Sequence, residues 1–178
     1  MMRRAILLAV VIMFASGQAG GSPPDEIKLK MVKSLSKLEP TEKRSMVLCV
    51  RGRAITNYEE TTVRSLRAGG EDTLWALKVS AAQNAQLMML AEAAQWPEMA
   101  AYFKTEMENV SNLIRGQTDW ANYRSASKEN EPRLGAALAP ELSRQDVHKR
   151  NFNKLSQLCE ELTNAIIARA KTSAVGRP

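Results

Sequence analysis

The chain has 178 residues, of which 44% are hydrophobic, so it is long enough for one domain with a substantial core and too short for two typical domains. Its 25 Lys and Arg residues outnumber its 19 Asp and Glu residues, which gives a formal net charge of +6. This excess is modest, and no basic cluster is interleaved with aromatic residues. The composition therefore argues against nucleic acid as a partner.

Residues 1–19 have the pattern of a secretory signal peptide. Two arginines precede an apolar run over residues 5–15, and small residues follow it. The run is about eleven residues long, well short of the roughly 20 that a membrane-spanning helix needs. We therefore expect cleavage after Ala19, or after Gly17, with no stable membrane anchor left behind. The pattern predicts a periplasmic or secreted protein.

Residues 20–178 are predicted to form one helical domain with a flexible start, residues 20–24, and a C-terminal tail, residues 172–178. Strand patterns are almost absent from this part of the chain, whereas helix-capping and helix-breaking residues are frequent. The expected fold class is all-α, a bundle of about five amphipathic helices around one core.

The first expected helix has apolar residues at helical spacing, namely Ile27, Met31, Leu35 and Leu38. It should end at Glu39, because a residue that precedes a proline is disfavoured in the helical conformation. Thr41 can cap a second helix, which runs towards Ala68 and is stopped by two glycines, residues 69–70.

Asp72 can cap a third helix, which the pair Trp96–Pro97 interrupts. The apolar face of this helix is predicted to consist of Leu74, Leu77, Ala81, Ala85 and Met88. Pro97 suits the first position of a fourth helix, which should end at Gly116. That helix has the clearest amphipathic pattern in the chain, formed by Met99, Phe103, Met107, Val110 and Ile114.

Residues 117–140 contain scattered proline and glycine, so we expect a long connection there with one or two broken helices. Ser143 and Asp146 resemble a capping box at the start of one long last helix. Its apolar positions are Val147, Phe152, Leu155, Leu158, Cys159, Leu162 and Ile166.

The two cysteines, Cys49 and Cys159, are predicted to form a disulfide. An even number of cysteines in an oxidising compartment favours a bridge, and both lie on the apolar faces of their helices. The bridge would close a loop of roughly 110 residues and would contribute roughly 4–5 kcal/mol by the chain-entropy account. The alternative is a pair of buried thiols that act as small hydrophobic residues.

Two charged residues interrupt apolar faces and are the weak catalytic candidates of the chain. Lys78 lies on the face of the third expected helix, and Glu106 lies on that of the fourth. Buried charges are rare unless they are paired. Either both side chains extend to solvent from the edge of their faces, or they face a polar pocket with Arg51 and Arg53.

His148 is the single histidine, and we expect it to be a solvent-exposed residue in the first turn of the last helix. No nucleophile elbow, E-x-x-H pattern or His/Cys cluster occurs, so the sequence predicts no metal site and no cofactor. Non-covalent haem held between Met31 and His148 is the remaining cofactor hypothesis. Met at helical spacing is more often core filling.

Trp120 and Tyr123 are the candidate partner-binding residues, because aromatic residues in irregular segments favour recognition surfaces. The leading functional hypothesis is an exported interaction protein that binds another protein, of the inhibitor, immunity or secretion-accessory type. The alternative is a small-anion enzyme with an architecture similar to that of the exported helical chorismate mutases. In those enzymes Arg and Lys hold carboxylates, and Glu or Gln faces the ether oxygen. No motif of that family occurs in this chain.

Overall fold

Seven α-helices and no strand make up the part of the chain that the computed structural model describes, residues 24–68 and 71–175. The helices are α1 (Pro24–Leu35), α2 (Pro40–Ala68), α3 (Glu71–Ala93), α4 (Pro97–Ile114), α5 (Trp120–Leu142), α6 (Gln145–Lys154) and α7 (Ser156–Val175). The predicted all-α class is confirmed. The predicted signal peptide, residues 1–19, lies outside the described residues.

The helices α2, α3 and α4 begin and end close to their predicted bounds, whereas α1 ends at Leu35, before the predicted end at Glu39. Pro97 stands at the first turn of α4, and Gln95, with φ of 57°, turns the chain between α3 and α4. Gly116, with φ of 67°, follows the end of α4, where its lack of a Cβ permits this left-handed conformation.

The expected broken connection over residues 117–140 is wrong, because α5 is a continuous helix there. The side chain of Asp119 accepts a hydrogen bond from the backbone N–H of Asn122 at 2.8 Å and caps its N-terminus. Two prolines, Pro132 and Pro140, lie inside the helix. Both are exposed, so water can satisfy the carbonyl groups that lose a backbone donor at each proline.

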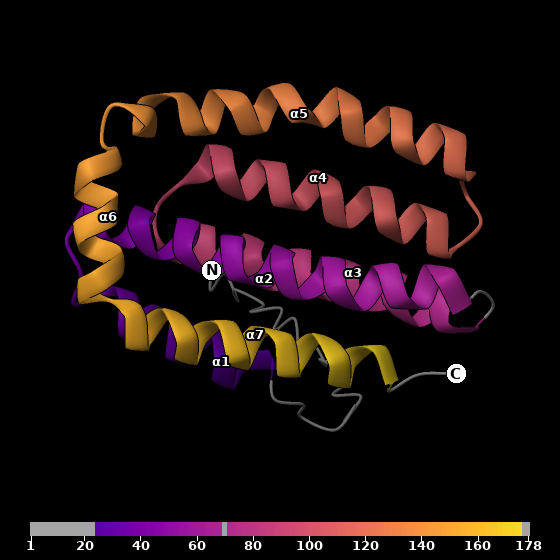
Figure 1. The fold of residues 1–178 in the computed structure, drawn as a ribbon, viewed down its shortest axis with the longest axis horizontal. Helices are drawn as coiled ribbons and strands as arrows, with labels where there is room; N and C mark the ends of the chain where they lie inside the picture. Colours follow the sequence, from indigo (N-terminus) through magenta and orange to yellow (C-terminus); the bar gives the residue numbers. More distant parts are fainter. Residues whose placement is uncertain (1–23, 69–70, 176–178) are drawn as a thin grey trace, which may run out of the picture.

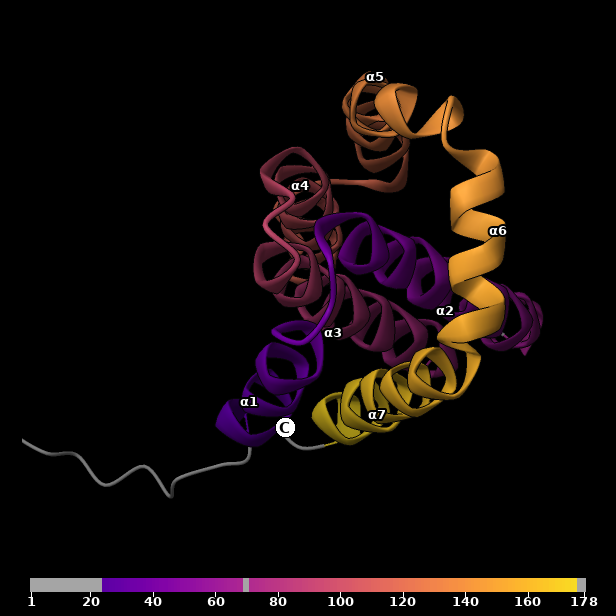
Figure 2. The same ribbon diagram turned by 90° about the vertical axis from the view of Figure 1, so that its left-hand side faces the viewer.

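The expected long last helix is also wrong, because it is divided at Leu155 into α6 and α7. Leu155 has φ of −105° and ψ of 13° and is only 9% exposed. Figure 2 shows α6 running across one end of the molecule from α5 to α7. α7 then runs into the predicted tail as far as Val175, and Ala174 near its end is 5% exposed.

The helix α3 is the centre of the fold, because it contacts α1, α2, α4 and α7. In Figure 1, α4 lies between this central group and α5, and α5 forms the outermost layer. The largest fully buried side chains come from α1, α2, α3, α4 and α7 and from the turn before α4: Trp96, Phe103, Met31, Leu35, Met46, Leu90, Met99, Leu162 and Ile166. One main core therefore serves the helices, with a small second cluster around Val79 and Ala170.

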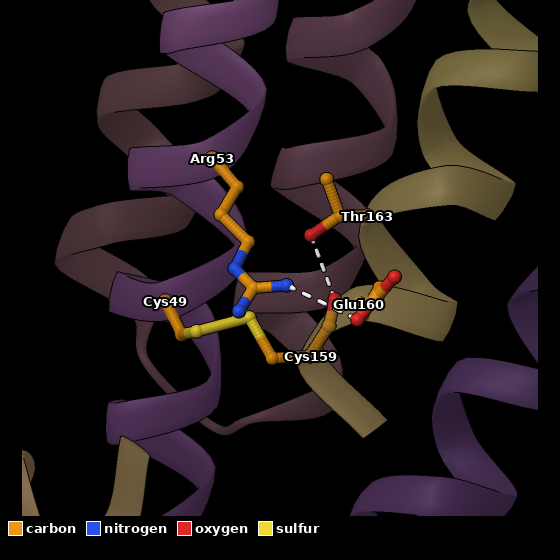
Figure 3. Close-up of a disulfide and its surroundings, with 5 residues drawn as sticks. All are labelled: Cys49, Arg53, Cys159, Glu160 and Thr163. Atoms are coloured by element: carbon orange, nitrogen blue, oxygen red, sulfur yellow. Dashed lines mark hydrogen bonds and ion pairs between the residues drawn. A yellow bond between two sulfur atoms is a disulfide. The ribbon is translucent and has the colours of Figure 1, made fainter. Parts of the chain in front are cut away.

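The predicted disulfide is confirmed. Cys49 on α2 is bonded to Cys159 on α7, with 6.2 Å between their Cα atoms. Figure 3 shows the Arg53 side chain beside this bridge, where it forms an ion pair with Glu160 at 3.9 Å. Thr163 donates a hydrogen bond to the Cys159 carbonyl at 2.7 Å. Among the described helices, none has the length and apolar character that crossing a membrane requires.

Candidate functional site

A cleft of about 230 Å³ lies among α2, α3, α4 and α5. α2, α3 and α4 each contribute residues that share one helix face at spacings of three or four, and α5 contributes one residue. The lining consists of Arg51 and Ile55 from α2, Ser80, Gln83, Asn84 and Leu87 from α3, Tyr102, Phe103 and Glu106 from α4, and Tyr123 from α5. The cleft is thus half polar and contains one cation and one carboxylate.

Arg51 supplies the positive charge of the cleft. Its side chain is partly buried, and it forms no ion pair within the part of the chain that the structure describes. Its Nε atom is shielded from solvent and has no hydrogen-bond partner among the described residues. A partly desolvated guanidinium without a carboxylate partner is costly, so an anionic ligand would lower its free energy.

Glu106 supplies the negative charge, and α5 holds its carboxylate in place. Asn130 donates a hydrogen bond to Oε1 at 2.7 Å, and Ser127 donates one to Oε2 at 3.2 Å. Asn130 is only 2% exposed and also donates to the Tyr102 carbonyl at 3.1 Å. The carboxylate is therefore oriented before any ligand arrives.

Tyr102 lies close to both charges. Burial raises the pKa of its hydroxyl, the negative charge of Glu106 raises the pKa further, and Arg51 acts in the opposite direction. The net shift is upward, so Tyr102 stays neutral at physiological pH and can both donate and accept a hydrogen bond.

Two polar side chains in the α3 wall of the cleft, Gln83 and Asn84, donate hydrogen bonds within the protein. Gln83 donates to the Ala54 carbonyl at 2.9 Å, and Asn84 donates to the Ser80 carbonyl at 3.2 Å. Gln83 and Ser80 are each 6% exposed. Their buried positions also show that the predicted apolar face of α3 is rotated, since Leu74 is 42% exposed.

Two of the four candidate residues predicted from the sequence, Arg51 and Glu106, line the cleft, and the other two lie elsewhere. Lys78 is partly buried on α3 but does not line the cleft, and Arg53 points towards Glu160 beside the disulfide. The polar residues of α3 and Tyr102 were missed. In the sequence, the polar residues of α3 form a run at positions i, i+3 and i+4 ahead of Leu87. This run resembles an ordinary solvent-facing stripe of a helix.

Trp120 and Tyr123 lie in the first turn of α5, not in an irregular segment as expected. Their rings pack edge to face, with centroids 5.7 Å apart. Trp120 is 41% exposed, whereas Tyr123 lines the cleft. The aromatic pair therefore connects the cleft with the outer surface.

The prediction of an exposed His148 is wrong, because its side chain is only 6% exposed. One ring nitrogen, Nδ1, lies 2.8 Å from the Ser45 hydroxyl, and the other, Nε2, lies 3.0 Å from Glu141 Oε2. Met31 is fully buried in the main core. With both ring nitrogens engaged, His148 is not placed to share a haem iron with Met31.

Ser45 contacts His148, which contacts Glu141, and this arrangement resembles the nucleophile, base and orienting acid of nucleophilic catalysis. The surroundings of the three residues do not suit that chemistry. Ser45 is 1% exposed, and its hydroxyl accepts a hydrogen bond from Asn151 at 2.9 Å and donates to the Thr41 carbonyl at 2.8 Å. A nucleophile must be reachable by substrate. These residues instead join α2, α5 and α6.

Two other depressions lie outside this cleft. One of about 400 Å³ lies over the turn between α3 and α4 around Trp96 and Pro97, and one of about 250 Å³ lies between α4 and α5 around Asn109 and Arg133. Within residues 24–68 and 71–175, no three His, Cys, Asp or Glu side chains gather as a metal site would require.

The chain matches no protein-family model, no curated protein and no solved structure.

Proposed function

We propose that this chain is an exported binding protein that holds a small ligand with an anionic group in the cleft among α2, α3, α4 and α5. The observation that carries the proposal is Arg51, a cleft cation without an ion-pair partner in the described part of the chain. A carboxylate that reaches this guanidinium would gain charge-assisted hydrogen bonds.

Export is supported by two features. The sequence of residues 1–19 has the pattern of a signal peptide, and the Cys49–Cys159 bridge is of the kind that persists in an oxidising compartment. Together they favour a periplasmic or secreted location.

Binding is favoured over catalysis because the cleft contains one cation. An isomerase acting on a dicarboxylate would need a second cation, and neither Lys78 nor Arg53 lines the cleft. The second carboxylate of such a substrate would instead meet the negative charge of Glu106. The geometry thus supports the four-residue enzyme hypothesis less well than a binding protein.

A thermal-unfolding screen of small carboxylates tests this proposal. The purified, disulfide-bonded chain should show a raised Tm with at least one carboxylate, because a ligand that binds the native state stabilises it. Arg51→Met should abolish the shift. Arg53→Met, two residues along the same helix but outside the cleft, is the matched control and should retain it. A screen without any shift, or equal shifts in both variants, contradicts the proposal.

A protein partner is the second candidate function, and the exposed aromatic ring of Trp120 favours it. Tryptophan is enriched at the centres of protein interfaces. A photo-crosslinking residue at position 120, compared with one at the exposed position 171 on α7, tests this candidate in the producing cell. A reproducible adduct that forms at position 120 alone supports it, and the absence of adducts at both positions contradicts it.

A further inference from the structure

Arg51 and Glu106 face the same cleft from different helices, α2 and α4, without forming an ion pair with each other. Opposite charges in one partly desolvated cleft attract, so a direct pair would be the simplest way to stabilise both. The fold keeps them apart, because hydrogen bonds from α5 fix the Glu106 carboxylate. A ligand that bridges them needs both a negative and a positive group.

The negative end of the ligand is assigned to Arg51. Its guanidinium is planar and donates through several N–H groups, which suits a carboxylate. The neutral hydroxyl of Tyr102 lies nearby and can donate a further hydrogen bond.

The positive end is assigned to Glu106 and the α3 wall. A carboxylate offers about four acceptor positions, and Asn130 and Ser127 occupy two of those on Glu106. The amide groups of Gln83 and Asn84 donate within the protein, so their oxygens remain as further acceptors. An ammonium has three donors and no acceptor, and it therefore matches this side of the cleft.

The remaining lining sets the size and polarity of the ligand. Ile55, Leu87 and Phe103 add apolar surface beside the two charges. The volume of about 230 Å³ lies below the roughly 300 Å³ at which sites for drug-sized ligands begin. The space suits one small molecule with an apolar side chain.

We infer that the cleft binds a free zwitterionic amino acid with an apolar side chain, its carboxylate at Arg51 and its ammonium at Glu106. This inference rests on the proposed function and specifies the ligand class. Glu106 becomes the residue that distinguishes an amino acid from a simple carboxylate.

Titration calorimetry on the disulfide-bonded chain tests this with two matched sets of probes. One set is leucine, 4-methylpentanoate, which lacks the ammonium, and 3-methylbutylamine, which lacks the carboxylate. The other is phenylalanine, 3-phenylpropanoate and 2-phenylethylamine. In at least one set the amino acid should bind roughly 10- to 100-fold more tightly than either analogue, the usual effect of removing a charged hydrogen bond.

Two variants assign the ends of the ligand. Glu106→Gln should remove the preference for the amino acid over its carboxylate analogue. Arg51→Met should remove the preference for the amino acid over its amine analogue. The controls are Glu108→Gln, an exposed position on the same helix, and Arg53→Met, and both should bind like the unchanged chain.

The outcomes separate this inference from the proposed function. If a carboxylate analogue binds as tightly as its amino acid, or if Glu106→Gln retains the preference, the ligand class is wrong and the proposed function stands. If neither amino acid binds while another carboxylate gives an Arg51-dependent Tm shift, the ligand class is again wrong and the proposed function again stands. If no carboxylate of any kind binds, both are wrong.

Discussion

At the scale of single residues, Glu141 is the most constrained charge in the described structure. It is 3% exposed and contacts Arg44, Arg144 and His148. Burial by itself would raise the pKa of its carboxyl group. The hydrogen bond and positive charge of Arg44 outweigh burial, with smaller contributions from Arg144 and His148, so the pKa lies below its ordinary value.

This lowered pKa predicts a loss of stability in acid. A carboxyl group with a lower pKa in the folded state stabilises the protein fully above its unfolded-state pKa, about 4.3 for Glu, and loses that contribution as the pH falls through the folded-state pKa. We expect the urea concentration at the midpoint of unfolding to decrease as the pH is lowered below about 4.5. In Glu141→Gln the midpoint should be lower at pH 7 and should change less between pH 7 and pH 3. Glu108→Gln, at an exposed position, is the control, and parallel pH profiles for the two variants would contradict the prediction.

Single residues also differ in how far their place in the structure could be predicted from the sequence. Glu106 was identifiable because a charge at an apolar position is unusual. Arg51 was named only as a cation on the neighbouring helix that could share a polar pocket with Glu106. His148 was not, because its burial depends on Ser45, which lies 103 residues away in the sequence. The polar lining of α3 was missed for the same reason, since only the neighbouring helices determine which face of α3 is buried.

At the scale of elements, α5 is the helix least expected from its sequence. Pro132 and Gly135 both disfavour a helix, and both lie near its middle. The helix persists because Asp119 caps it and because α5 packs along α4, where Asn130 bonds to Tyr102 and Glu106. Tertiary contacts thus override local propensity here.

Two substitutions in α5 test this account. Pro132→Ala should stabilise the protein by up to about 3 kcal/mol, and Gly135→Ala by about 1 kcal/mol, because alanine favours a helix more than either residue. A Cβ at position 135 meets no atom within 4 Å, so the alanine adds no clash. Urea unfolding measures both effects, and slower hydrogen exchange of α5 amides should accompany them. A loss of stability in both variants would contradict a continuous α5.

The helices that could be predicted were those with clear amphipathic spacing and a proline or glycine at their ends, as in α4. The break at Leu155 had no such signal, because Leu155 continues the apolar pattern from Phe152 to Leu158. The break arises from tertiary contacts. Hydrogen bonds of His148 and Asn151 to Ser45 attach α6 to α2, and α6 must therefore run in a direction different from that of α7.

At the scale of the whole molecule, the Cys49–Cys159 bridge joins α2 to α7 across 110 positions of the sequence. A cross-link over a loop of this length should stabilise the folded state by roughly 4–5 kcal/mol, because it restricts the unfolded chain. The double variant Cys49→Ala/Cys159→Ala should therefore have a much lower urea midpoint and Tm. Arg53→Met tests the neighbouring ion pair, which is exposed and should contribute less than about 1 kcal/mol. Equal effects of the two changes would contradict the prediction.

The same bridge determines what a single backbone cut can do. All lining residues of the cleft, from Arg51 to Tyr123, lie between the two cysteines. A protease that hydrolyses the exposed Arg115–Gly116 bond in the turn after α4 would produce two polypeptides, each of which keeps one half of the cystine. They would remain one covalent molecule. In a compartment that contains proteases, nicked copies could thus keep every wall of the cleft until a reductant separates them.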